Sequence, residues 1–189
     1  MRPLSFVKMQ GLGNDFVVID ARAEAPKLGP EQIRWIADRR LGIGCDQLVT
    51  IEKAPGAADA FMRIHNADGS EAESCGNAAR CVALWLGAQL GQARLTILTG
   101  GGALDAAGLP DGRARIDMGQ PRIDWQDIPL ARAADTLHVP FSLDALADPV
   151  ATNMGNPHVT FFVPDVATVD LARLGPVIEH DALFPARVN

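Results

Sequence analysis

The sequence predicts an α+β fold that is rich in short strands and contains few helices. Short runs of alternating or continuous apolar residues recur along the chain, and turns rich in glycine and proline separate them. Helical periodicity is confined to three stretches. Because the helices are few and do not alternate regularly with the strands, the pattern favours α+β over a doubly wound α/β fold.

The first 66 residues are expected to form four strands and one helix. The strands are expected at residues 4–9, 15–20, 47–52 and 60–65. The helix is expected at residues 29–40, because Pro30 suits the first helical position and Gly42 suits a stop.

A second set of strands and tight turns begins at residue 94. Strands are expected at residues 94–99, 103–106, 113–118 and 159–163. The proline-containing stretch 119–135 is expected to be a linker, and residues 170–184 a helix broken at Pro176. This pattern predicts a first unit at residues 1–119 and a second at residues 120–189.

A helix expected at residues 76–90 carries almost no charge. No charged residue occurs from Cys81 to Ala93, and Gly91 supplies a stop. A helix that is apolar all round is buried on all sides. In a strand-rich chain we therefore expect a curled sheet to surround it.

Cys75 lies directly before this helix and is the candidate reactive residue. The first N–H groups of a helix lack intrahelical partners and carry partial positive charge, which favours a thiolate or a bound carboxylate. Free cysteines are usually small buried apolar residues, but Ser74, Gly76 and Asn77 around Cys75 are not typical core residues. The helix start therefore predicts a carboxylate site beside a partly ionised thiol.

The other cysteines, Cys45 and Cys81, are expected to pack in the core. An odd count of three argues against a disulfide framework and favours a cytoplasmic chain with free thiols. The net charge of −6 without a basic run argues against a nucleic-acid partner. The most apolar run is about half the length that a membrane span needs, so no membrane segment is expected.

Five side-chain amides occur in or beside turns that contain glycine or proline. They are Asn14, Gln47, Asn66, Asn77 and Asn156. An amide both donates and accepts hydrogen bonds, which suits a zwitterionic amino acid, although asparagine also simply forms turns. The four histidines are scattered without ligand spacing, so no metal is expected, and no dinucleotide or phosphate-loop motif is complete.

Together these features resemble the diaminopimelate epimerase family of cofactor-independent amino-acid epimerases. The matching stretches are KMQGLGNDFVVID, RRLGIGCDQL, NADGSEAESCGNAARC, MGNPH and LFPARVN. The resemblance implies two similar lobes, each a β-barrel-like sheet around a central helix, with the substrate between them. It implies interconversion of LL- and meso-diaminopimelate in lysine and peptidoglycan-precursor biosynthesis, without pyridoxal phosphate or another cofactor, by an enzyme that is often a homodimer.

The resemblance also implies roles for individual residues. Cys75 would be one of two thiols that remove and return the α-proton on opposite faces. Gly76 and Asn77 would bind the carboxylate through the helix end, and His158 matches a position that tunes the thiols. The remaining substrate-contacting positions are matched by Asn14, Gln47, Asn66, Asn156 and Asn189.

The family's second catalytic cysteine belongs to a later Cys-Gly-Thr/Ser-Gly motif that these 189 residues do not contain. The final RVN resembles the opening of a strand. We therefore expect a second lobe that is only begun here, and no substrate turnover by this chain alone.

Three other functions remain open. Cys75, His158 and Asn156 would also suit a cysteine-nucleophile hydrolase or acyl transferase, which an acyl adduct on Cys75 would reveal. A non-enzymatic binding module of the same fold would bind diaminopimelate without α-proton exchange. A sister isomerase, such as a proline racemase or a phenazine-pathway relative, would leave diaminopimelate unchanged, although the NADGSE and CGN block argues against it.

Overall fold

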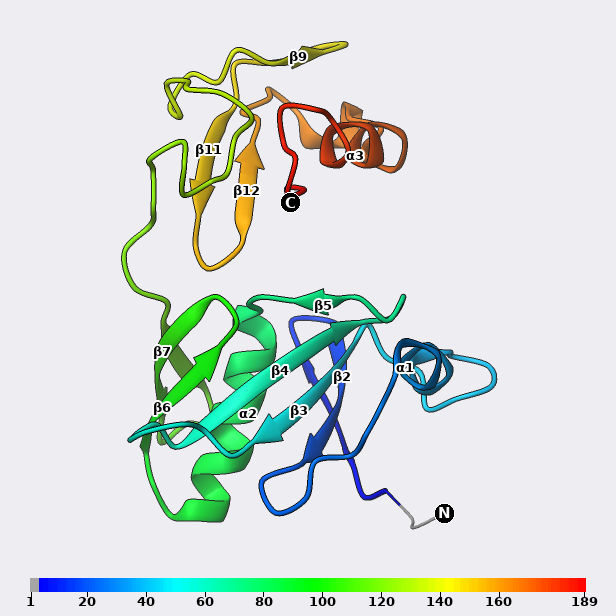
Figure 1. Cartoon of the computed structure of the whole chain (residues 1–189), viewed down its shortest axis with the longest axis vertical. Helices are drawn as coiled ribbons and strands as arrows, with labels where there is room; N and C mark the ends of the chain where they lie inside the picture. Colours follow the sequence, from blue (N-terminus) through cyan, green and yellow to red (C-terminus); the bar gives the residue numbers. More distant parts are fainter. Residues whose placement is uncertain (1–3) are drawn as a thin grey trace. The chain divides into compact units, whose positions relative to one another are not determined.

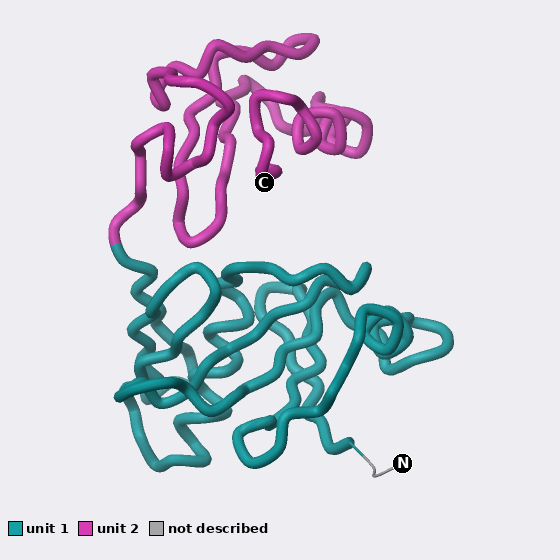
Figure 2. Tube along the Cα trace, in the orientation of Figure 1, with its two compact units in different colours: residues 1–119 teal, residues 120–189 magenta. Residues whose placement is uncertain are grey.

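The computed structural model describes residues 4–189, and the chain divides into two compact units at residue 119 (Figure 2). Residues up to 119 form the first unit, and residues 120–189 form the second. Each unit has a hydrophobic core of its own.

The first unit is built on one eight-stranded mixed sheet, which Figure 1 shows curling around a helix. Its strands are β1 (Val7–Gly11), β2 (Asn14–Asp20), β3 (Gln47–Glu52), β4 (Ala60–Asn66), β5 (Glu71–Ala72), β6 (Arg94–Thr99), β7 (Gly102–Gly108) and β8 (Ala114–Asp117). The order is β1-β2-β3-β4-β6-β7-β8, with β5 paired to β4. The β2–β3 and β4–β6 pairs are parallel and the others antiparallel.

Helix α2 (Gly76–Leu90) packs against strands from both ends of this sheet, including β1, β7 and β8. Ala78, Val82 and Leu86 follow one another at intervals of four on one helical face and are fully buried. The prediction of a helix inside a curled sheet is thus confirmed. Its burial is less complete than expected, because Trp85 is half-buried and residues 88–90 are exposed.

Helix α1 (Pro30–Ala37) packs Ile33 and Ile36 in a second core cluster, together with Leu48 of β3. The predicted extension of this helix to residue 40 was wrong. Asp38 adopts an extended backbone, and its carboxylate accepts hydrogen bonds from the backbone N–H groups of residues 40 and 41, both at 2.7 Å. An aspartate side chain that bonds nearby backbone groups favours a turn over another helical turn.

The second unit contains two short hairpins and one α-helix. Its elements are β9 (Ser142–Leu143), β10 (Leu146–Ala147), β11 (Val150–Asn153), β12 (Pro157–Thr160), a 3₁₀ turn η1 (Val166–Thr168) and α3 (Leu171–Glu179). Strand β9 pairs with β10, and β11 pairs with β12. Leu174 and Ile178 of α3 pack with Phe184 and Ala151 in one core cluster.

Several predicted boundaries were wrong. The first strand begins at Val7 instead of residue 4, and the strand expected at 159–163 spans Pro157–Thr160, because its hairpin pairing with β11 starts at Pro157. Helix α3 continues through Pro176, whose missing N–H removes one intrahelical bond. The stretch 119–135 is more than a linker, since Ile128 is fully buried in the core of the second unit.

Among residues 4–189, no helix combines the length and apolar character that crossing a membrane requires.

Candidate active site

One edge of the first sheet gathers side chains that lie far apart in the sequence. Strands β2 and β3 are parallel and begin at Asn14 and Gln47, so both residues lie at the same edge. Strand β4 runs in the opposite direction and ends at Asn66, directly across from Gln47. Helix α2 begins at the same edge, because Asn77 contacts Asn14.

Cys75 forms the N-cap of α2 and is half-buried. Its sulfur accepts the backbone N–H of Ala78 at 3.5 Å, and its thiol lies 3.8 Å from Oδ1 of Asn14. Gly76 and Asn77 are the first two residues of the helix, where N–H groups have no intrahelical partner. The thiol therefore lies at the positive end of a buried helix, next to an amide.

In the side-chain amides of Asn14 and Asn77, both the nitrogen and the oxygen form hydrogen bonds. Nδ2 of Asn14 donates to Oδ2 of Asp46 at 3.0 Å, and Nδ2 of Asn77 donates to Oδ1 of Asn14 at 3.4 Å. The guanidinium of Arg80 donates to Oδ1 of Asn77. These four side chains form one hydrogen-bonded chain beside Cys75.

Gln47 and Asn66 form a second pair of amides. Nε2 of Gln47 donates to Oδ1 of Asn66 at 2.9 Å, and Nδ2 of Asn66 donates to Ser70 Oγ at 3.1 Å. The oxygen Oε1 of Gln47 is buried and has no hydrogen-bond partner within residues 4–189. A buried acceptor without a partner is costly, so Gln47 carries an unused hydrogen-bond acceptor at this site.

The other two cysteines lie in the core, as predicted. Cys45 is 2% exposed and Cys81 is 4% exposed. Burial raises the pKa of the Cys45 thiol and also that of the Cys81 thiol. Both side chains therefore favour the neutral thiol, and Cys75 is the more accessible of the three.

A cluster of ion pairs flanks Asn14. The carboxylate of Asp15 accepts hydrogen bonds from Arg39 at 2.7 Å and from Lys8 at 2.6 Å. These contacts, chiefly the one with Arg39, hold the pKa of Asp15 well below its usual range. Arg39 also bonds Asp46 at 2.8 Å, so it ties the two acidic residues next to the amide together.

Three predicted site residues lie close together in the second unit. Asn156 lies in the turn between β11 and β12, and its backbone oxygen is 2.9 Å from Nδ1 of His158. A carbonyl only accepts, so Nδ1 of His158 carries a proton and donates it in this bond. The backbone of Asn189 pairs with β12, since its N–H donates to Pro157 O and its oxygen accepts from Val159.

The predicted residues thus form two groups, one in each unit. The first group contains Asn14, Gln47, Asn66, Cys75, Gly76 and Asn77. The second contains Asn156, His158 and Asn189. Within residues 4–189, no group of three His, Cys, Asp or Glu side chains is placed to hold a metal ion.

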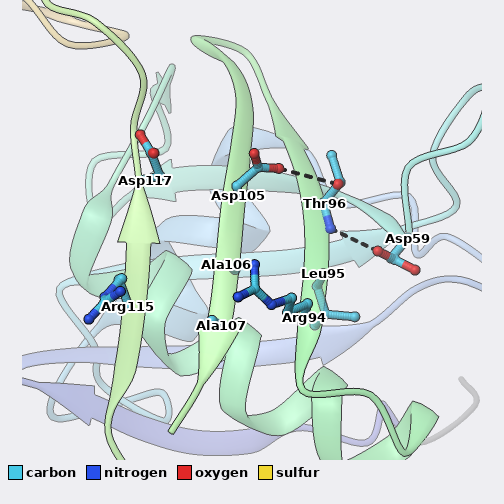
Figure 3. A pocket seen from close by; sticks show the side chains of 9 residues that line it. All are labelled: Asp59, Arg94, Leu95, Thr96, Asp105, Ala106, Ala107, Arg115 and Asp117. Carbon is cyan, nitrogen blue, oxygen red and sulfur yellow. Dashed lines mark hydrogen bonds between the residues drawn. The ribbon is translucent and has the colours of Figure 1, made fainter.

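A different hollow of about 460 Å³ lies on strands β6, β7 and β8 (Figure 3). Asp105 and Asp117 are paired across two of these strands, and Arg94 and Arg115 form a basic row on the other side of the hollow. None of its lining residues belongs to the predicted site. We therefore place the candidate active site at the start of α2.

Residues 6–123 match the family model described as diaminopimelate epimerase. The chain belongs to the diaminopimelate epimerase family. It is 52% identical to a diaminopimelate epimerase of Zymomonas mobilis subsp. mobilis over 98% of this chain, and 52% identical to one of Acidiphilium cryptum over 97%. In each case it spans 66% of the relative's length, slightly less than two thirds.

Solved structures support the fold of this epimerase family member. A hydroxyproline epimerase from Agrobacterium vitis matches with a TM-score of 0.59 at 16% identity, over 93% of this chain and 54% of that one. A predicted epimerase from Pseudomonas aeruginosa matches with a TM-score of 0.58 at 16% identity, over 93% of this chain and 67% of that one. At this identity the likeness shows the fold alone, and it agrees with the predicted α+β class.

Sequence analysis of this family member missed the charged residues that hold the amides. Asp46, Arg39 and Arg80 contact Asn14 or Asn77 directly or through one another. Asp46 directly precedes Gln47, a predicted site residue. That adjacency was the available signal, because a residue directly before Gln47 lies at the same end of β3.

Proposed function

We propose that this protein interconverts LL- and meso-diaminopimelate, with Cys75 as one of two acid–base thiols. The observation that carries the proposal is the accessible thiol at the N-cap of buried helix α2, set among fixed amides. Family membership supports diaminopimelate as the substrate. The pathway would be lysine and peptidoglycan-precursor biosynthesis.

The chemistry needs an acid–base group on each face of the α-carbon. In one direction the Cys75 thiolate takes the α-proton, and the carbanion is reprotonated on the opposite face by a second thiol. The N–H groups of Gly76 and Asn77 would hold the carboxylate and stabilise the charge that it gains. No cofactor is part of this proposal.

The second thiol is expected from outside these 189 residues. Cys45 and Cys81 are buried in the core, so neither is placed to act on a substrate. We propose that the 189 residues alone perform no epimerisation. The family's later cysteine motif would supply the second thiol.

The amide residues are proposed to bind the rest of the substrate. Asn14, Gln47 and Asn66 offer acceptors and donors at the start of α2. In the second unit, Asn156 and Asn189 would contact the substrate, and His158 would tune the thiols.

The surroundings of the enzyme are also proposals. Three free cysteines suit a reducing compartment, which favours the cytoplasm. The homodimer that the resemblance implies can be checked by light scattering. The net charge of −6 gives no support to a nucleic-acid partner.

The decisive experiment is α-proton exchange in D₂O. Residues 1–189 are joined to the remaining part of the Zymomonas mobilis relative, and LL-diaminopimelate is followed by proton NMR. We expect loss of the α-proton signal, and at least a 1,000-fold slower exchange in Cys75→Ser, on the order of the loss seen when an essential acid–base group is removed.

Cys81→Ser is the matched control, because it replaces a buried thiol on the same helix. Exchange that survives Cys75→Ser would contradict the proposed role. An acyl adduct on Cys75 without exchange would favour a cysteine-nucleophile enzyme instead. Absence of epimerisation by the 189-residue chain would agree with the need for a second thiol.

A further inference from the structure

Asp46, Asn14, Asn77 and Arg80 form a hydrogen-bonded chain with a single polarity. Each amide donates toward Asp46 and accepts from the direction of Arg80. The chain passes Cys75, whose sulfur lies 3.8 Å from Oδ1 of Asn14.

The two ends of this chain dictate the orientation of both amides. A carboxylate only accepts hydrogen bonds, so the group of Asn14 that faces Asp46 must be its NH₂. A guanidinium only donates, so the group of Asn77 that faces Arg80 must be its oxygen. Both ends require the same arrangement, with the carbonyl of Asn14 turned toward Asn77 and Cys75.

Asp46 is itself held firmly. Its Oδ2 accepts the backbone N–H of Asp15 at 3.0 Å in addition to Asn14, and its Oδ1 accepts from Arg39 at 2.8 Å. Three donors therefore fix the carboxylate that orients Asn14. Charge-assisted hydrogen bonds of this kind are the stronger ones in proteins.

The orientation of Asn14 affects the protonation of the neighbouring sulfur. A carbonyl oxygen can accept a hydrogen bond from a thiol but can donate nothing to a thiolate. An amide turned the other way would donate its N–H and favour the thiolate. Turning one amide thus changes which form of Cys75 is stabilised.

We propose that Asp46 is a positioning residue that holds the Asn14 carbonyl toward Cys75 and so favours the protonated thiol. The proposal rests on the proposed function only for its catalytic meaning, namely that Cys75 is kept ready to give a proton. The contacts that join Asp46, Asn14 and Cys75 all lie within the first unit.

Other ionisable groups near the thiol remain unchanged in the test. On its own segment and helix these are Glu73, Arg80 and Cys81, and beyond Asn14 and the replaced Asp46 they are Asp15 and Arg39. Directly after β8, the neutral side chain of Met118 lies next to Gly76.

The test is the pH dependence of alkylation of Cys75 by iodoacetamide in the 189-residue chain. Peptide mapping separates Cys75 from the buried Cys45 and Cys81. In Asp46→Ala, Asn14 loses the partner of its NH₂ and can turn toward the sulfur. The midpoint of the pH–rate profile should move to lower pH by about one unit, the size of a hydrogen bond to a charged group.

Two variants separate orientation from charge. Asp46→Asn removes the charge, but its carbonyl can replace Oδ2 and still accept from Asn14, while Arg39 keeps Asp15. Its midpoint should therefore move by less than about 0.3 units. Asp20→Ala removes a similar aspartate–arginine pair at the far end of β2 and should leave the midpoint unchanged.

Equal shifts in Asp46→Ala and Asp46→Asn would overturn the proposal, because they would reflect lost charge. Faster alkylation at every pH without a moved midpoint would also overturn it, because it would reflect mere loosening. Circular dichroism checks folding, and if Asp46→Ala does not fold, Asn14→Ala removes the carbonyl itself and should lower the midpoint. The readout needs no turnover, so its failure is distinct from failure of α-proton exchange.

Discussion

At the scale of single residues, His65 on β4 makes the stability of the first unit depend on pH. Burial lowers the pKa of His65 below its ordinary value, and its Nδ1 is buried with no hydrogen-bond partner within the described residues. As the pH falls, His65 therefore takes up a proton at a higher pH in the unfolded chain than in the folded protein. We expect the first unit to lose stability as the pH drops below about 6.5, and the loss to be smaller in His65→Gln, as measured by urea unfolding at pH 7.5 and 5.5.

His138 provides the comparison of opposite sign. Its hydrogen bond with Asp148 raises the pKa of His138, so it adds stability as the pH falls below the folded value. His138 lies in the second unit, so His138→Gln should steepen the loss of stability of that unit on acidification. An unchanged pH dependence in His65→Gln would contradict the role given to His65.

Cys75 could be proposed from the sequence because its signal is local. A thiol directly before an uncharged helix needs no tertiary information to stand out. Asp46 was missed because its role depends on the parallel pairing of β2 and β3, which brings residues 14 and 46 together across 32 positions. Parallel register cannot be read from a single sequence, so the residues that hold the site are less visible than the site itself.

At the scale of elements, the end of α2 makes a testable case. Alanine normally favours a helix interior by about 1 kcal/mol over glycine. At Gly87, however, a Cβ atom would lie 2.7 Å from the oxygen of Gln92, where the chain turns back after Gly91. We expect Gly87→Ala to destabilise the first unit by about 1–3 kcal/mol, as overpacking does, measured by urea unfolding.

The neighbouring position supplies the control. Ala88 is exposed on the same helix, and Ala88→Gly should cost about 1 kcal/mol through helix propensity alone. Opposite substitutions at adjacent positions should thus both destabilise. A more stable Gly87→Ala protein would mean that the chain after α2 moves to make room.

The ends of helices and strands were predicted well where a local sequence signal sets them. They were predicted poorly where strand pairing sets them. Gly91, with a φ of 66°, ends α2 at the position expected from the sequence. The ends of β12 follow from its pairing with β11 instead, and the apolar stretch up to residue 163 misled the prediction. Ile128 was hidden in a stretch whose proline and aspartate content is typical of linkers.

At the scale of the whole molecule, each of the two units has a core drawn from its own stretch of the sequence. The core of the first unit draws on residues 16–106 and surrounds α2, whereas that of the second draws on residues 128–188. Each set is contiguous in sequence, which is the pattern expected of segments able to fold separately. We therefore propose that residues 1–119 and 120–189 are separate folding units.

Residues 1–119 expressed alone should keep the hydrogen-exchange protection that α2 has in the 189-residue chain. The reason is that β1, β7 and β8, which pack on α2, all lie within this segment, and a chain of this length can bury a core of its own. A shorter chain that ends at residue 112 lacks β8 (Ala114–Asp117) and should protect α2 less. If α2 exchanged freely in residues 1–119, the first unit would depend on residues beyond its own core, and the division at residue 119 would describe shape without describing folding.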